Sequence, residues 1–151
     1  MSQHYIIDGN NLIGKIKDLW QLQSSDGQKS REKLVFLLDR YFNNIKATVS
    51  LHFDGFEKEF VGTTKIKVHY SGKKTADENI KREIDLRKNP KIVTIISSDR
   101  SVFDYAKKSS CTVIKAEDFQ KKLKSSSSAE SEQKIIESIS NEEIKKLFGV
   151  K

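Results

Sequence analysis

Cysteine, proline and long apolar runs are nearly absent from this 151-residue sequence. The single cysteine, Cys111, cannot form an internal disulfide, which is typical of proteins of the reducing cytosol, and we expect it to be a buried packing residue. No stretch approaches the roughly 18 apolar residues of a membrane span. The N-terminal residues become polar at Asp8, too soon for a signal peptide. We therefore expect a cytoplasmic protein with no membrane partner.

Basic residues outnumber acidic ones and give a net charge of +7. Residues 125–151 hold four lysines and five glutamates, so residues 1–124 carry a charge of +8. An excess of this size favours a polyanionic partner such as nucleic acid. Charge alone is equally compatible with a soluble basic domain that binds no nucleic acid, so the motifs have to decide between the two.

Short apolar segments alternate with helical patterns along the chain. Strands are predicted at residues 5–7, 49–53, 66–70, 92–96 and 112–115. Helical patterns follow Ser30, Thr75 and Asp99 and begin again at Ala116, whereas the polar residues 21–29 predict a loop. This alternation predicts an α/β fold, a doubly wound sheet of about five mostly parallel strands with helices on both faces.

A run of serines divides the sequence into a main part and a tail. We expect residues 1–124 to form the domain and residues 125–133 to form a serine-rich linker. Residues 134–151 predict a helical tail, because Ser140 and Glu143 have the spacing of a capping box before an apolar pattern.

Acidic residues follow the predicted strands with unusual consistency. Asp8 follows the first strand, Asp54 the second and Asp99 the fourth, and Asp77 and Glu78 open the helix after the third. Each has an ordinary local explanation as a turn or cap residue. The carboxyl ends of parallel strands share one edge of the sheet, however, so we expect these carboxylates to converge there. The same edge is expected to receive Asn10 and Asn11.

Converging carboxylates repel one another, and a bound cation would offset that repulsion. Oxygen ligands suit Mg²⁺ or Mn²⁺, and such ions in a basic protein suit the attack of water on a phosphodiester. His52 and His69 lie within predicted strands, where a role on the sheet face is favoured over catalysis. Metal-independent acid–base cleavage of RNA is therefore the weaker alternative.

Basic residues lie beside the predicted acidic edge. Lys73 and Lys74 precede the helix that carries Asp77, and Arg100 follows Asp99, so all three are candidate RNA contacts. The segment at residues 72–75 superficially resembles a P-loop, but the upstream glycine is missing and an ATPase is disfavoured.

Four segments in order resemble the signatures of NYN domains, relatives of the PIN-type nucleases, and most closely those of the bacterial YacP-like group. They are IIDGNNL at residues 6–12, FDG at 53–55, TADE at 75–78 and ISSDR at 96–100. The similarity spans roughly residues 4–124, and the final helix after Ser140 is also similar. The resemblance implies a PIN-like sheet and Mg²⁺- or Mn²⁺-dependent endoribonuclease activity, with messenger RNA cleaved in association with ribosomes.

The resemblance also implies roles for individual residues. Asp8, Asp77 and Asp99 would be the catalytic carboxylates and main metal ligands. Many PIN-type nucleases place an acidic residue two positions after the last of these, where this chain has Ser101. Further metal ligands and supporting residues would be Asp54, Glu78, Asn10, Asn11 and, in place of the missing acid, Asp104.

Two other functions remain open at this point. A non-catalytic RNA- or ribosome-binding module could keep the fold and basic surface, although it would have no need of the full aspartate set. A phosphatase of another aspartate-based α/β family is the third hypothesis. That chemistry typically uses a D-x-D motif after the first strand, and here its third position is Asn10.

Overall fold

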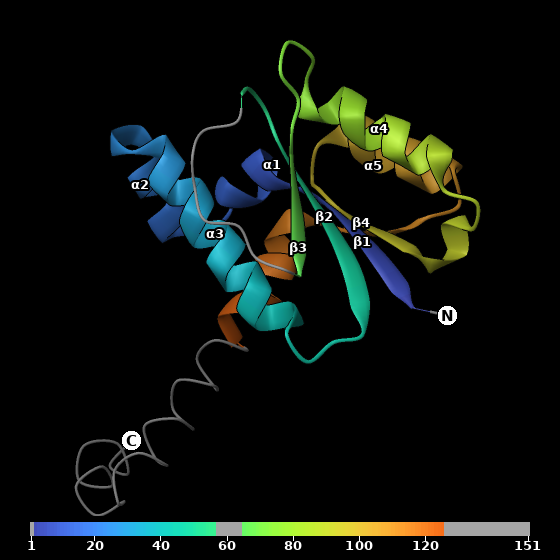
Figure 1. The fold of residues 1–151 in the computed structure, drawn as a ribbon, viewed down its shortest axis with the longest axis horizontal. Helices are drawn as coiled ribbons and strands as arrows, with labels where there is room; N and C mark the ends of the chain where they lie inside the picture. The colour runs from blue at the N-terminus through green and yellow to red at the C-terminus, as the bar shows by residue number, and fades with distance from the viewer. Residues whose placement is uncertain (1, 57–64, 126–151) are drawn as a thin grey trace, which may run out of the picture.

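A five-stranded, all-parallel sheet lies at the centre of the protein, in a computed structural model that describes residues 2–56 and 65–125 (Figure 1). The strands have the order β3-β2-β1-β4-β5. Their bounds are Gln3–Asp8 (β1), Ala47–Phe53 (β2), Ile66–Tyr70 (β3), Val93–Ile96 (β4) and Thr112–Ile114 (β5). The predicted α/β fold and parallel sheet are confirmed. The predicted linker and helical tail lie outside the described residues.

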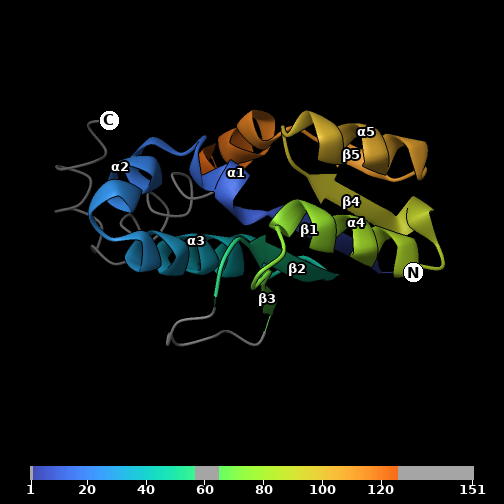
Figure 2. The ribbon, with the colours of Figure 1, turned by 90° about the horizontal axis from the view of Figure 1, so that it is seen from above.

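Helices cover both faces of the sheet (Figures 1 and 2). One face packs against α1 (Gly9–Ile13), α2 (Lys17–Ser25), α3 (Gly27–Phe42) and the helical residues 116–125. The other face packs against α4 (Ala76–Leu86) and α5 (Arg100–Lys108). Alternation along β1 separates two cores, because Ile7 joins the first cluster and Ile6 the second.

The order of the strands determines where a ligand site can form. From β1 the chain builds β2 and β3 on one side, then crosses back to add β4 and β5 on the other. The strand order therefore reverses at β1, between β2 and β4. In doubly wound sheets ligands bind outside the carboxyl ends of the strands at such a reversal. Asp8 ends β1, and Asp99 follows β4 by three residues.

The loop predicted over residues 21–29 is wrong. Helix α2 occupies Lys17–Ser25, and α3 begins at Gly27 after the cap residue Asp26, whose side chain accepts a hydrogen bond from the Lys29 amide. Only Leu19 is buried in α2, so a polar surface helix carries little apolar periodicity to reveal it. Ser30 is a buried residue inside α3, and its hydroxyl donates to the Leu19 carbonyl.

Other boundaries agree with the sequence to within a few residues. Thr75 caps α4 by accepting a hydrogen bond from the Glu78 amide, so the helix predicted after Thr75 is confirmed. Pro90 opens a short 3₁₀ turn, Pro90–Ile92, so β4 begins one residue later than predicted. Cys111 is buried as expected, and burial raises the pKa of its thiol. No helix within the described ranges has the length and apolarity needed to cross a membrane.

Candidate active site

A cavity of about 670 Å³ lies at the carboxyl end of the sheet and is lined largely by acidic and amide side chains. Its walls come from the ends of β1, β2 and β4 and from the first turn of α4. Five of the predicted carboxylates and both asparagines are therefore brought together in one place. The lining residues are Asp8, Asn10, Asn11, Asp54, Thr75, Ala76, Asp77, Glu78 and Asp99.

The junction of β1 and α1 brings the start of helix α1 against the end of β2. Asp8 ends the strand and Gly9 opens α1 directly, with no turn between the two elements. A Cβ atom at position 9 would lie 2.5 Å from the Phe53 ring and 2.7 Å from the His52 carbonyl oxygen. Only glycine fits this contact without displacing β2. The approach positions the two asparagines that follow beside the neighbouring strand ends.

The two asparagines fasten the three central strand ends to one another. The Asn10 side-chain oxygen accepts a hydrogen bond of 2.7 Å from the backbone amide of Asp54, after β2. The Asn11 side-chain oxygen accepts one of 2.7 Å from the amide of Ser98, after β4. Both side chains therefore hold the ends of neighbouring strands in place.

Asp54 lies against the amino end of α4. One of its carboxylate oxygens accepts a hydrogen bond of 2.8 Å from the Ala76 amide, the first residue of that helix. A helix N-terminus favours negative charge, and Asp77 and Glu78 lie in the same first turn. Asp77 also forms an ion pair of 2.9 Å with Lys81, one turn further along the helix.

Ser97 links the two aspartates on either side of the strand reversal. It is fully buried, and its hydroxyl donates a hydrogen bond of 2.9 Å to Asp8 while accepting one of 3.0 Å from the Asp99 amide. Asp99 in turn caps α5 by accepting from the Val102 amide. Ser97 was not singled out as a site residue from the sequence, because a serine after a strand carries no distinguishing pattern.

The environment of Asp8 disfavours its negative charge. The side chain is 7 % exposed, and burial raises the pKa of its carboxyl from 3.8 to about 6. The charges of Asp99 and Asp54 raise this pKa further, and the hydrogen bond from Ser97 partly opposes the rise. Burial with like charges nearby is the situation that a bound cation relieves.

The donor set of the cavity fits a hard divalent cation. Its ligand atoms are carboxylate and amide oxygens, which Mg²⁺ and Mn²⁺ prefer. The hydrogen bonds to Asp54 and Asp99 each engage one carboxylate oxygen, and each group has a second oxygen. The raised pKa of Asp8 agrees with this, because burial disfavours its charge and the neighbouring carboxylates of Asp99 and Asp54 add to the effect.

Four residues predicted for the site are not among those lining the cavity. Asp104 and Arg100 pair with each other on α5 at 3.7 Å, and Arg100 is 93 % exposed. Lys73 and Lys74 are exposed in the segment that leads to Thr75 at the cavity wall. Asp104 thus stands apart from the carboxylates it was expected to complete. The three basic residues adjoin the cavity in sequence and remain candidate RNA contacts.

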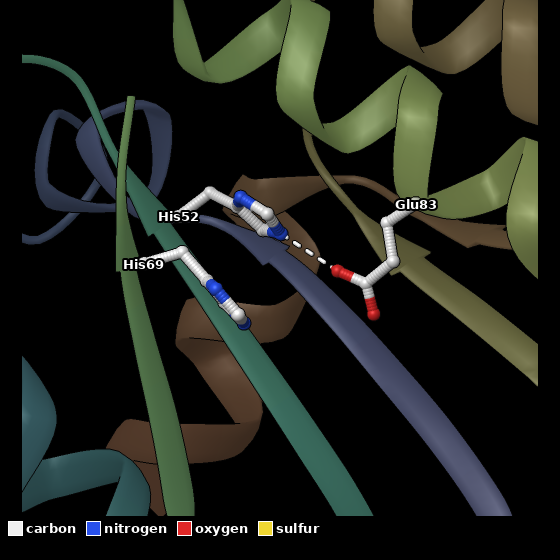
Figure 3. A group of neighbouring side chains, drawn as sticks. All are labelled: His52, His69 and Glu83. Atoms are coloured by element: carbon white, nitrogen blue, oxygen red, sulfur yellow. Dashed lines mark hydrogen bonds and ion pairs between the residues drawn. The ribbon is translucent and has the colours of Figure 1, made fainter. Parts of the chain in front are cut away.

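A second polar group lies on the α4 face of the sheet and was missed by sequence reasoning. His52, His69 and Glu83 offer ligand atoms that all lie within 4.8 Å of one another, and together they could hold a divalent metal ion (Figure 3). Among the described residues, no other group of three histidine, cysteine, aspartate or glutamate side chains places its ligand atoms this close together. The histidines lie on the sheet face, as expected, but His52 is only 4 % exposed and pairs with a carboxylate. The alternation of side chains in β2 and β3 does indicate that the two histidines share a face of the sheet. The position of Glu83 above them depends on how α4 packs, which the sequence of α4 alone does not reveal.

Glu83 is the centre of this polar group. Burial alone would raise the pKa of its carboxyl, but hydrogen bonds with His4, His52, Arg87 and Ser50 hold it well below its ordinary range. Burial also lowers the pKa of His69, and the neighbouring His52 contributes to the same effect. At neutral pH the group therefore contains an ionised carboxylate beside a neutral His69 imidazole.

Comparison with known proteins places the chain in a family. The sequence matches the YacP-like NYN domain over residues 5–148. The fold is similar to that of Rae1 (YacP) from Bacillus subtilis, with a TM-score of 0.71, 20 % identity, and coverage of 91 % of this chain and 83 % of that one. Its W164L mutant gives a TM-score of 0.73 at 18 % identity, with 93 % and 84 % covered. No curated protein matches the sequence. The match over nearly the whole length shows that the chain belongs to the YacP-like NYN domain family.

Proposed function

We propose that the protein is a metal-dependent endoribonuclease that hydrolyses RNA phosphodiester bonds in the aspartate-lined cavity. The observation that carries the proposal is the convergence of five acidic side chains on one cavity at the reversal of the strand order. Family membership supports it, because NYN domains are relatives of the PIN-type nucleases. The cofactor would be Mg²⁺ or Mn²⁺, and the compartment the cytoplasm.

The chain's own residues supply binding and positioning. Asp8, Asp77 and Asp99 would hold the metal, with Asp54 and Glu78 as further ligands. Such a metal, when bound, lowers the pKa of coordinated water and polarises the phosphoryl group. Asn10, Asn11 and Ser97 hold the strand ends in register, so the carboxylates keep their separation without the substrate. Lys73, Lys74 and Arg100 would contact the phosphates of the RNA.

Messenger RNA on the ribosome is the substrate that we infer from the family resemblance. The net charge of the chain, +7, suits such a polyanionic target. The main alternative is a binding module that uses the same surface without turnover. The binding module predicts that RNA binds without being cleaved, whereas the nuclease predicts cleavage products.

A panel of substrates tests the proposal. The purified full chain is incubated with a mixed RNA pool, the same sequences as DNA, and a small phosphoester, with Mg²⁺, with Mn²⁺ or with a chelator. We expect cleavage of RNA alone, dependent on metal, without 2′,3′-cyclic phosphate ends, because water rather than the ribose 2′-hydroxyl is the nucleophile. Ends with a 2′,3′-cyclic phosphate would contradict hydrolysis by a metal-held water. If naked RNA stays intact, the assay is repeated on translating ribosomes; intact messenger RNA there would favour the binding module.

A further inference from the structure

The group formed by His52, His69 and Glu83 lies in a groove of about 1010 Å³ that is lined by residues of α4 and of strands β2 and β3. None of the three lines the aspartate cavity. His52 and His69 are direct partners in the parallel register of β2 and β3, so their side chains leave the same face of the sheet. Glu83 comes down from α4 and points at them (Figure 3).

Hydrogen bonds fix the orientation of the Glu83 carboxylate. Its Oε2 atom accepts hydrogen bonds from Ser50 at 2.8 Å and Arg87 at 2.9 Å and lies 2.7 Å from His4 Nε2. Its other oxygen, Oε1, faces His52 Nε2 at 2.7 Å. One oxygen is therefore held by the surrounding protein while the other is directed at the histidine pair. Metal-binding carboxylates in proteins are oriented by outer hydrogen bonds in this manner.

Both histidines can present a nitrogen lone pair to an ion. His52 Nδ1 has no hydrogen-bond partner among the described residues, so the ring proton can move there when a metal ion replaces the hydrogen bond between Nε2 and Glu83 Oε1. His69 stacks on His52 with ring centroids 4.8 Å apart and an interplanar angle of 16°. Within the described part of the chain no hydrogen bond holds the His69 ring, and it lines the open groove. One of its ring nitrogens lies within 4.8 Å of the ligand atoms of the other two residues.

We propose that His52, His69 and Glu83 form a Zn²⁺ site that is distinct from the aspartate cavity. Two imidazole nitrogens and one carboxylate oxygen are a ligand set that zinc uses when it keeps a fourth position open. Magnesium and manganese prefer the all-oxygen set of the aspartate cavity, so the two sites differ in ion as well as in place.

The groove also indicates what the fourth ligand is. The groove that holds the three ligands is also lined by four basic residues, Lys67, Arg82, Arg87 and Lys88, so it is positively charged. These cations weaken the binding of a free dication and favour an anion, such as hydroxide or a phosphate oxygen, on the bound ion. An ion here joins β2, β3 and α4. The ends of β2 and α4 carry Asp54 and Asp77, so the zinc would brace the elements on which the aspartate cavity is built.

Equilibrium dialysis with Zn²⁺ and visible spectroscopy with Co²⁺ test the site on the full chain after a chelator has removed bound metal. The protein carries Asp8→Asn, so that the aspartate cavity contributes less to binding. We expect one Zn²⁺ per chain and an intense Co²⁺ absorption typical of four-coordinate nitrogen–oxygen ligation. Replacing half-buried His69 by alanine should weaken Zn²⁺ binding by at least about 10-fold. Lys67→Ala, on the same strand and face, should bind Zn²⁺ as well or better.

Three outcomes would overturn the zinc site. The first is saturation of the protein only at millimolar Zn²⁺. The second is a Zn²⁺ affinity that His69→Ala leaves unchanged. The third is Zn²⁺ binding that the original sequence shows and that Asp8→Asn alone abolishes. Circular dichroism of each variant verifies the fold, and Glu83→Gln gives a second test of the ligand set. None of these readings involves RNA, so the zinc site and the nuclease can fail separately.

Discussion

Replacing Asp8 by asparagine should stabilise the metal-free protein while removing a ligand from its proposed active site. A rise in the pKa of the Asp8 carboxyl from 3.8 to about 6 makes its ionised form unfavourable in the folded state. The difference corresponds to at most about 3 kcal/mol of unfolding free energy. Asparagine has nearly the same shape and keeps an oxygen that can accept the hydrogen bond from Ser97.

The pH dependence fixes the sign of the effect. Well below pH 3.8 the carboxyl is protonated in both the folded and the unfolded chain, so Asp8 does not lower the unfolding free energy relative to asparagine. Between pH 4 and pH 6 the unfolded chain releases its proton first, because its pKa is the lower one, and the stability of the native sequence falls relative to the variant. Above pH 6 both states are ionised and the gap stays constant at its maximum.

Urea unfolding at pH 4, 6 and 8 in the presence of a chelator measures this gap. Asp118→Asn serves as the control, because Asp118 is exposed and its replacement should change the unfolding free energy far less. Adding Mn²⁺ should stabilise the native sequence more than Asp8→Asn and so narrow the gap. Equal unfolding free energies of the two proteins at pH 8, or a difference between them that does not change with pH, would refute the reasoning about the buried Asp8 carboxylate.

Three further predictions concern positioning and RNA binding. Gly9→Ala should lower the unfolding free energy by about 1–3 kcal/mol in urea titrations, because its Cβ would lie 2.5 Å from an aromatic carbon. Gly27→Ala is the control and should have little effect, because a Cβ there would have nothing within 4 Å. Equal losses in the two variants would contradict the packing at the β1–α1 junction. Ser97→Ala should cost about 1–2 kcal/mol and slow RNA cleavage, since it releases two hydrogen bonds that position the site; unchanged cleavage would show that they are dispensable. The double change Lys73→Ala and Lys74→Ala should reduce the salt dependence of RNA binding by a slope of about 1–2 in a log–log plot, and an unchanged slope would remove both lysines from the interface.

The strand ends and their carboxylates could be predicted from the sequence because the signals are local. A buried strand such as Val93–Ile96 is continuous in sequence, and the residues that follow it lie at a known edge of the sheet once the sheet is parallel. Asp8, Asp54 and Asp99 could therefore be gathered at one edge without coordinates. Their separations could not, because these depend on the hydrogen bonds of Asn10 and Asn11.

The remaining features depend on packing between distant segments. Helix α2 contributes one buried residue, Leu19, so its sequence has the composition of a loop. The histidine group requires the register of β2 against β3 and the packing of α4 over both strands. These contacts bring Glu83 next to His52 and His69, which lie 31 and 14 residues before it in the sequence. No local pattern encodes that meeting. Alternating polar residues in a strand are read as a solvated face, and here His52 is buried instead.

The rate of RNA cleavage by Asp99→Asn, compared with the native chain in saturating Mn²⁺, tests the central claim most directly. Asparagine caps a helix as well as aspartate does, so α5 keeps its start and only the charge is lost. If Asp99 holds the metal for hydrolysis, cleavage should fall by at least about 100-fold while circular dichroism and RNA binding stay unchanged. Cleavage at an undiminished rate would contradict an active site in the aspartate cavity.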